Sequence, residues 1–79
     1  MTELTLVTRD GCHLCDAMKA VVAQVQRHRP VQLTEVDIST RPDLQRRYDT
    51  EIPVLLRGDH VIAQQRISVS QLIVALSGA

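Results

Sequence analysis

The distribution of apolar and polar residues along the chain predicts four short strands. Residues 3–8 alternate between apolar and polar side chains among β-branched neighbours, and residues 31–38 form a second such run. The stretch IPVLLRGDHVIAQ holds two further apolar runs, which Gly58-Asp59 divides. Because glycine accepts a positive φ without steric cost, this pair predicts a tight hairpin turn. Glu35, a charged residue within the second run, indicates an edge position in the sheet.

Two helices are predicted between these strands. The first follows Gly11, ends before Pro30 and carries an apolar stripe with helical spacing. The members of this stripe are Leu14, Ala17, Met18, Val21, Val22 and Val25. The second helix is expected over residues 42–48, with Ser39 or Thr40 as its N-cap.

The last predicted helix has the clearest start signal of the chain. Ser68 and Gln71 have the spacing of a capping box, in which each side chain binds the backbone N–H of the other residue. Ile67 and Leu72 are placed to form a hydrophobic staple beside it. Gly78 is expected to end this helix, and the stripe that faces the core consists of Val69, Leu72, Ile73 and Leu76.

The predicted order is strand, helix, strand, helix, strand, strand, helix, in a single domain of residues 1–79. A crossover helix makes the first two strands parallel, whereas the short turn at Gly58 makes the last two antiparallel. One four-stranded mixed sheet with helices on both faces satisfies both constraints. The fold class is therefore α/β.

Composition and charge argue against several kinds of partner. Nine Lys plus Arg balance nine Asp plus Glu, and Tyr48 is the one aromatic residue. Without a basic patch or aromatic residues for base stacking, we expect no nucleic-acid partner. The start MTELTLVT has neither a basic leader nor a long apolar run. We therefore expect no membrane segment and a cytoplasmic location.

The two cysteines of the chain, Cys12 and Cys15, lie where the first predicted strand passes into the first helix. In a reducing compartment such a pair is more often chemical than structural. Free N–H groups and the positive dipole end of a helix stabilise a thiolate there, so we expect the pKa of Cys12 to lie below the ordinary value of about 8.5. Cys12 is predicted to be the attacking thiol on the first turn, because the sheet shields Cys15 on one side.

Charged residues of both signs accompany the cysteine pair. Arg9, and His13 when it is protonated, favour the thiolate, whereas Asp10, Asp16 and Glu51 oppose it. An exposed spacer between the cysteines is an equally simple role for His13. The charges thus predict a lowered thiol pKa but not the size of the change.

A metal site and a purely structural role are alternatives for the two cysteines at this point. Zinc usually takes four ligands, and without a second cysteine pair only the distant His13, His28 and His60 could supplement them. Small copper chaperones also begin with a strand, a two-cysteine loop and a helix, but they carry a methionine where Asp10 stands and do not end on a helix. A structural role would make both cysteines buried and inert, although the start of a helix is a poor place to bury a thiol.

The stretch TRDGCHLC, followed by EIPVL at residues 51–55, resembles the glutaredoxin branch of the thioredoxin fold. This resemblance covers the whole element order and implies a minimal thioredoxin fold, βαβαββα. It implies a cis peptide bond between Ile52 and Pro53 beside the thiols, and an Ile52 backbone that pairs with the peptide chain of a substrate. It also implies that Arg9 helps to hold glutathione. Substrate contacts are accordingly expected at Arg9, His13, Leu14, Ile52 and Pro53.

Two departures separate this chain from the best-known glutaredoxins. His13-Leu14 stands in place of a proline-aromatic spacer. Before the last helix, QQRISVSQL replaces the Gly-Gly and acidic residues that grip the γ-glutamyl end of glutathione, with Ser68 and Ser70 where acids would be expected. The pattern is closer to that of small glutaredoxin-like proteins.

We therefore expect a thiol-disulfide oxidoreductase without a bound cofactor, acting as a monomer. Cys12 attacks a disulfide-containing protein or a glutathione mixed disulfide, and Cys15 then releases the reduced product. Electrons would come from glutathione or from a flavoprotein of the thioredoxin reductase type. One alternative is metal or iron–sulfur cluster binding by Cys12 and Cys15 across a dimer, and another is a redox-silent module that binds peptides at Ile52.

Overall fold

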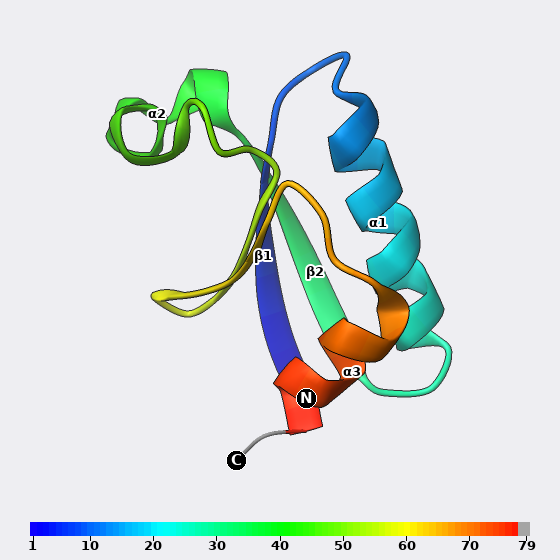
Figure 1. Ribbon diagram of the computed structural model, residues 1–79. Helices are drawn as coiled ribbons and strands as arrows, with labels where there is room; N and C mark the ends of the chain where they lie inside the picture. Colours follow the sequence, from blue (N-terminus) through cyan, green and yellow to red (C-terminus); the bar gives the residue numbers. More distant parts are fainter. Residues whose placement is uncertain (78–79) are drawn as a thin grey trace.

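The computed structural model describes residues 1–77, whose elements follow each other in the predicted order (Figure 1). Helix α2 is preceded by a short 3-10 helix, η1, that the sequence pattern did not predict. The elements are β1 (Thr2–Thr8), α1 (His13–Gln26), β2 (Val31–Asp37), η1 (Ile38–Thr40), α2 (Pro42–Tyr48), β3 (Val54–Arg57), β4 (His60–Gln64) and α3 (Val69–Ser77).

The strands form one mixed sheet in the order β2-β1-β3-β4. Strand β1 pairs with β2 in parallel and with β3 antiparallel, so it lies inside the sheet. Strands β3 and β4 are joined by the predicted turn, in which Gly58 has a φ of +61°. Glu35 lies on β2 at an edge of the sheet, as its charge indicated. The predicted parallel and antiparallel pairings are therefore confirmed.

Alternation along β1 sends neighbouring side chains to opposite faces of the sheet, each with its own apolar cluster. We call one face the α1/α3 face; its buried residues are Leu4, Leu6, Met18, Val22, Val25, Leu55, Leu72 and Leu76. The other is the α2 face, with Val7, Ile38, Tyr48, Val54 and Leu56 buried. Figure 1 shows α1 and α3 on one side of the sheet and α2 on the other. Helices on both faces are thus confirmed.

The apolar stripe predicted for α1 is partly wrong at its start. Leu14 has 37% of its surface exposed and Ala17 is exposed as well, whereas Cys15 and Met18 are each only 1% exposed. The first turn of α1 therefore turns Cys15 toward the sheet. Cysteine packs as a small hydrophobic residue, but the predicted stripe counted only the other apolar residues. At the first turn the buried position is therefore Cys15 instead of Leu14.

The predicted N-cap of α2 is also wrong. Ser39 and Thr40 belong to η1, and the N-cap of α2 is Arg41, whose side chain makes no capping hydrogen bond. Asp37 takes the capping role one element earlier, because its carboxylate accepts the backbone N–H of Ser39 at 2.9 Å. The hydroxyl of Thr40 donates to the carbonyl of Asp37 at 2.7 Å and is thereby occupied.

The capping box of α3 is confirmed by both of its hydrogen bonds. The backbone N–H of Gln71 donates to the Ser68 hydroxyl at 3.1 Å, and the backbone N–H of Ser68 donates to the Gln71 side chain at 3.0 Å. Ile67 packs against the cluster that contains Leu72, as expected for a staple. Leu72 and Leu76 are buried and the rest of the predicted stripe is partly buried. Gly78, predicted to end this helix, lies outside the described residues.

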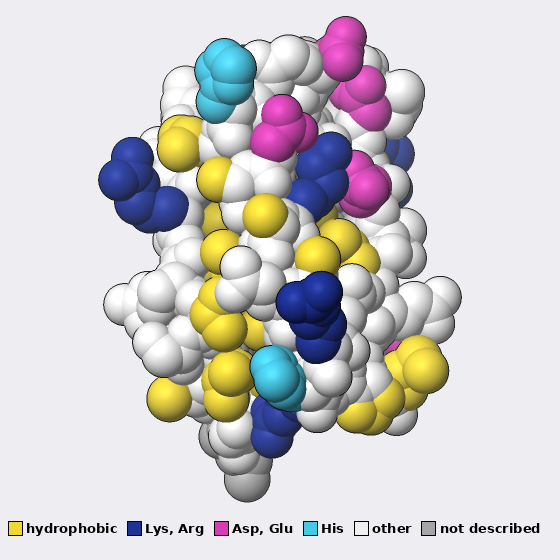
Figure 2. Space-filling model, turned by 90° about the vertical axis from the view of Figure 1, so that its right-hand side faces the viewer, with side chains coloured by type: hydrophobic (Ala, Val, Ile, Leu, Met, Phe, Trp, Pro, Cys, Tyr) yellow, Lys and Arg dark blue, Asp and Glu magenta, His cyan; other side chains and the backbone are white. Residues whose placement is uncertain are grey.

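The surface of the α1/α3 side carries charges of both signs. Figure 2, which looks onto this side, shows acidic side chains in its upper part, basic side chains from the upper part to the bottom, and hydrophobic atoms between them. None of the helices within residues 1–77 combines the length and the apolar character that crossing a bilayer requires.

Candidate active site

The link between β1 and α1 places the two cysteines at the end of an inner strand. Gly11, with a φ of +71°, turns the chain after β1. Cys12 then has extended backbone angles and is the N-cap of α1, so it precedes the helix instead of lying on its first turn. Its sulfur accepts the backbone N–H of Cys15 at 3.0 Å. This sulfur thus takes the place that a serine or aspartate oxygen has in an ordinary N-cap.

Cys12 and Cys15 form a disulfide bond, with their Cα atoms 5.2 Å apart. This Cα separation is within the usual range for disulfides. The extended backbone of Cys12 places it before the helix, with its sulfur over the first turn, where it accepts the Cys15 N–H. Cys15 is 1% exposed, whereas Cys12 is partly exposed. The two cysteines therefore differ in their access to solvent, as the sequence predicted.

A groove of about 450 Å³ opens beside Cys12. It combines the link after β1 with the segment that joins α2 to β3, two regions far apart in the sequence. Its lining residues are Arg9, Asp10, Gly11, Cys12, Asp49, Thr50 and Ile52. A ligand in this groove would lie against the exposed sulfur.

The peptide bond between Ile52 and Pro53 is cis, as the resemblance implied. Pro53 is buried, while Ile52 is partly exposed and lines the groove. Strand pairing begins only at Val54, and within residues 1–77 neither the N–H nor the carbonyl of Ile52 has a hydrogen-bond partner. Both backbone groups of this groove-lining residue are therefore without a partner among the described residues.

Arg9 and Asp49, which both line this groove, bind each other. The Nη2 atom of Arg9 donates to the Asp49 carboxylate and, at 3.2 Å, to the Asp49 backbone carbonyl. Both side chains are about half exposed, at 48% and 54%. The guanidinium is therefore committed to an acidic neighbour and does not face Cys12 as an unpaired charge.

Asp37 lies near the same end of the sheet, where β2 stops. The pKa of its carboxyl lies below the ordinary value, because it accepts the backbone N–H of Ser39 and the Ser39 hydroxyl; the charge of Arg9 acts in the same direction. Arg9 thus interacts electrostatically with acids from β2 and from the end of α2.

A family model described as glutaredoxin-like domain (DUF836) matches residues 3–77. The chain belongs to this glutaredoxin-like family. The family match covers the thiol link, the groove and the strands except the first residue of β1, so the resemblance in TRDGCHLC and EIPVL is confirmed. No curated protein matches the chain significantly.

Solved structures of similar size share the fold of this glutaredoxin-like chain. Protein XcR50 from X. campestris has 28% sequence identity and a TM-score of 0.81, with 96% of this chain and 97% of that chain covered. Protein Ne2328 from Nitrosomonas europaea has 25% identity and a TM-score of 0.80, with 92% and 88% covered. Thioredoxin 1 from Thermosipho africanus has 16% identity and a TM-score of 0.64, with 94% and 89% covered. The minimal thioredoxin fold is thereby confirmed.

The predicted site residues of the glutaredoxin-like chain are only partly brought together. Arg9, Cys12 and Ile52 share the groove, with Pro53 buried next to Ile52. His13 and Leu14 begin α1 on its exposed side and are not among the groove residues. Their predicted part in substrate binding stays a prediction.

Of the three acids that were predicted to oppose the thiolate, only one lines the groove. Asp10 lines the groove, as expected. Asp16 lies 3.5 Å from Lys19 on α1, and Glu51 accepts a hydrogen bond from Gln64 at 2.8 Å outside the groove lining. The pKa of Lys19 is raised chiefly by its hydrogen bond to Glu35 on β2, with Asp16 adding a smaller effect. The acids that do face the groove are Asp10 and Asp49.

Two groove residues, Asp49 and Thr50, were missed by the sequence reasoning. One signal could have identified Asp49: it directly follows the predicted end of α2, where an acidic side chain meets the negative end of the helix dipole. An acid in that unfavourable position suggests a cation nearby in the fold. Thr50 carried no comparable signal.

The described part of the chain offers few ligands for a metal. Within residues 1–77, no group of three or more His, Cys, Asp or Glu side chains is arranged to hold an ion. The two sulfurs would therefore need further ligands from a second chain or from a thiol such as glutathione to complete a tetrahedral site.

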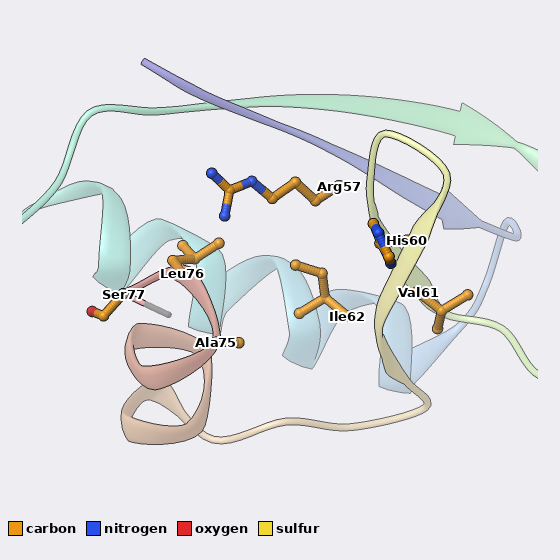
Figure 3. A pocket seen from close by; sticks show the side chains of 7 residues that line it. All are labelled: Arg57, His60, Val61, Ile62, Ala75, Leu76 and Ser77. Atoms are coloured by element: carbon orange, nitrogen blue, oxygen red, sulfur yellow. The ribbon is translucent and has the colours of Figure 1, made fainter. Parts of the chain in front are cut away.

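A separate hollow of about 680 Å³ lies between the β3–β4 hairpin and α3 (Figure 3). Its lining includes Arg57 and His60 from the hairpin and Leu76 from α3. Because Val54 pairs with Val7 near the thiol end of β1, the hairpin turn lies at the opposite end of the sheet. This hollow therefore has no part in the thiol site.

Proposed function

We propose that this glutaredoxin-like chain is a thiol-disulfide oxidoreductase that reduces protein disulfides with the Cys12–Cys15 dithiol. The observation that carries the proposal is the N-cap position of Cys12: its partly exposed sulfur accepts the Cys15 N–H, while Cys15 is buried within bonding distance. One sulfur is thus placed to meet a substrate and the other to meet only its partner.

The first step uses the helix start to stabilise the nucleophile. When the disulfide is reduced, the Cys12 thiolate keeps the Cys15 N–H as a hydrogen-bond donor and lies at the positive end of the α1 dipole. Both interactions favour the charged form and lower the pKa of Cys12. The thiolate attacks one sulfur of a substrate disulfide, forms a mixed disulfide and expels the other substrate sulfur as a thiolate.

The second step resolves this mixed disulfide. Cys15 loses its proton and attacks the sulfur of Cys12, which forms the internal disulfide and expels the remaining substrate sulfur. The substrate disulfide gains two electrons from the cysteine pair, Cys15 releases one proton, and the two expelled thiolates take up protons from the solvent. Burial of Cys15 at 1% exposure favours this internal attack over any reaction with a second substrate molecule.

The groove supports binding of an extended peptide next to Cys12. The unpaired N–H and carbonyl of Ile52 are available to form strand-like hydrogen bonds with a substrate backbone. Neither step needs a bound cofactor. Glutathione or a flavoprotein of the thioredoxin reductase type as electron donor, a monomeric state and a cytoplasmic location remain predictions from the sequence.

A trapping experiment tests the two sulfur roles. The Cys15→Ser variant, incubated with a disulfide-containing protein, is expected to accumulate a mixed disulfide through Cys12 that mass spectrometry detects. Cys15→Ala is the matched variant, because it leaves the buried site apolar and should trap the same adduct. Cys12→Ser is expected to form none. Loss of activity in all three variants without a trapped adduct would contradict the assigned roles.

The pKa of Cys12 gives a second test of the same proposal. In Cys15→Ala, the rate of alkylation by iodoacetamide is expected to reach half of its maximum at a pH below about 8.5, the value of an ordinary thiol. A half-maximum at or above that pH would show that the N-cap does not activate the sulfur. Iron and sulfide analysis after anaerobic purification tests the alternative of cluster binding.

A further inference from the structure

The groove beside Cys12 is lined by more acidic than basic residues. Arg9 is the one basic residue in its lining, and Asp10 and Asp49 are both acidic. Since Arg9 is bound to Asp49 by two contacts, an entering ligand meets a paired cation and a second carboxylate. The lining next to Cys12 therefore carries one more negative than positive charge.

We propose that Asp49 determines substrate choice by holding Arg9, so that the groove prefers disulfides with neutral or basic groups beside the sulfur to the carboxylate-bearing glutathione disulfides. This inference rests on the oxidoreductase function proposed above and specifies its substrate class. Asp49 acts here as a specificity residue, because it changes the charge that a bound substrate meets without touching the sulfurs.

The position of Asp49 makes its bond to Arg9 costly to break. Asp49 is the C-cap of α2, where the negative end of the helix dipole disfavours a carboxylate. Arg9 offsets the negative charge of the carboxylate and that of the helix end together, because it binds the Asp49 side chain and also the Asp49 backbone carbonyl. An anionic ligand that took Arg9 would leave the Asp49 carboxylate unpaired, next to that helix end and next to the ligand's own negative charge. A cationic ligand meets no such penalty.

The exposure of the pair limits the size of the effect. Arg9 and Asp49 are each about half exposed, so water screens their charges. One unit charge at contact distance in water corresponds to a change of about fivefold in a rate or binding constant. We therefore expect a graded preference and not an absolute exclusion of glutathione disulfide.

Three small symmetric disulfides of different charge test the proposal without any electron donor. Glutathione disulfide is anionic, hydroxyethyl disulfide is neutral and cystamine is cationic. The reduced protein is mixed with each at low salt, and its oxidation is followed by acid quenching, alkylation of the remaining thiols and mass spectrometry. The three disulfides differ in intrinsic reactivity. This difference cancels in the ratio of the rates that a variant and the unchanged protein show with the same disulfide.

Asp49→Asn is expected to raise the rate with glutathione disulfide about fivefold and to lower the rate with cystamine by a similar factor. The rate with the uncharged hydroxyethyl disulfide should change least of the three, and the melting temperature of the variant shows that it is folded. Asp59→Asn, which removes a carboxylate from the hairpin turn outside the groove, is the matched control and should change none of the three rates.

A double variant tests whether Arg9 is the group that Asp49 restrains. Adding Arg9→Gln to Asp49→Asn is expected to return the rate with glutathione disulfide to that of the unchanged protein. If the gain persists in the double variant, or if Asp49→Asn changes all three rates equally, the inference is wrong while the oxidoreductase function stands. If the unchanged protein oxidises with none of the disulfides, the proposed function itself fails.

Discussion

The two faces of the sheet are covered very unequally within residues 1–77. The α1/α3 face lies under helices of 14 and 9 residues, whereas the α2 face is covered by one helix of 7 residues and the short η1. The α1/α3 cluster includes Leu6 of the inner strand, at 0% exposure, and further partly buried residues surround it. The α2 cluster has few such neighbours, among them Leu44 and Ile52.

The thicker side holds the buried cysteine, and the thinner side forms part of the groove beside Cys12. Cys15 lies on the buried side of α1, so its sulfur is held by the thicker part of the molecule. Asp49 and Ile52, which form one wall of the groove, belong to the α2 side. Because elements with few buried apolar contacts open most easily, we expect the groove wall to adjust to substrates while the cysteine pair stays in place.

A pair of core truncations tests the unequal faces and has the largest expected effect. Leu6→Ala removes a fully buried side chain on the α1/α3 face and should lower the free energy of unfolding by about 2 to 5 kcal/mol. Leu44→Ala, at a partly buried position on the α2 face, should cost about 1 kcal/mol. Urea unfolding measures both values. Equal losses would show that the two faces contribute alike.

Removal of the α3 cap tests how much the start of α3 contributes to the stability of the thicker face. Ser68→Ala deletes the hydroxyl that accepts the Gln71 N–H and should lower the free energy of unfolding by about 1 kcal/mol. Urea unfolding again gives the value. Ser70→Ala serves as the control, because within residues 1–77 the Ser70 hydroxyl contacts only the Ser68 hydroxyl and no helix N–H. A loss with Ser70→Ala as large as with Ser68→Ala would contradict the role of the capping box.

Features with a local cause could be predicted from the sequence. The Gly58 turn depends on one residue that tolerates a positive φ, and the α3 start depends on two side chains three residues apart. The parallel pairing of β1 and β2 follows from the intervening helix. In each case the deciding contacts lie within a few residues or within one crossover unit, so the pattern contains the information.

Features that depend on tertiary contacts were mispredicted or missed. Leu14 looked like a core residue, but the sheet buries Cys15 in its place. The N-cap of α2 is Arg41 and not Ser39 or Thr40, which Asp37 binds within η1; these contacts are local, but the pattern gave no sign of η1. The bond between Arg9 and Asp49 joins residues 40 positions apart, and no local pattern could show it. The cis bond before Pro53 was anticipated through the family resemblance and not from the residues themselves.

Acid sensitivity at the end of β2 gives the smallest predicted effect. The pKa of Asp37 lies below its ordinary value of about 3.9, chiefly because its carboxylate accepts the Ser39 N–H. A lowered pKa in the folded state means that this carboxylate stabilises the fold above that ordinary value, and that the stabilisation is lost as the pH falls through the lower, folded-state pKa. The melting temperature should therefore decline below about pH 4.

Two variants at this cap separate the charge from the hydrogen bonds. Asp37→Asn keeps an acceptor for the Ser39 N–H but removes the charge, so its melting temperature should fall less between pH 7 and pH 3 than that of the unchanged protein. Ser39→Ala removes only the hydroxyl donor, the lesser of the two Ser39 contributions, and should keep most of the decline. Part of the decline persists in both variants, because Arg41 also lowers the pKa of Asp43. An Asp37→Asn profile that falls as steeply as that of the unchanged protein would place the acid sensitivity elsewhere than at this end of β2.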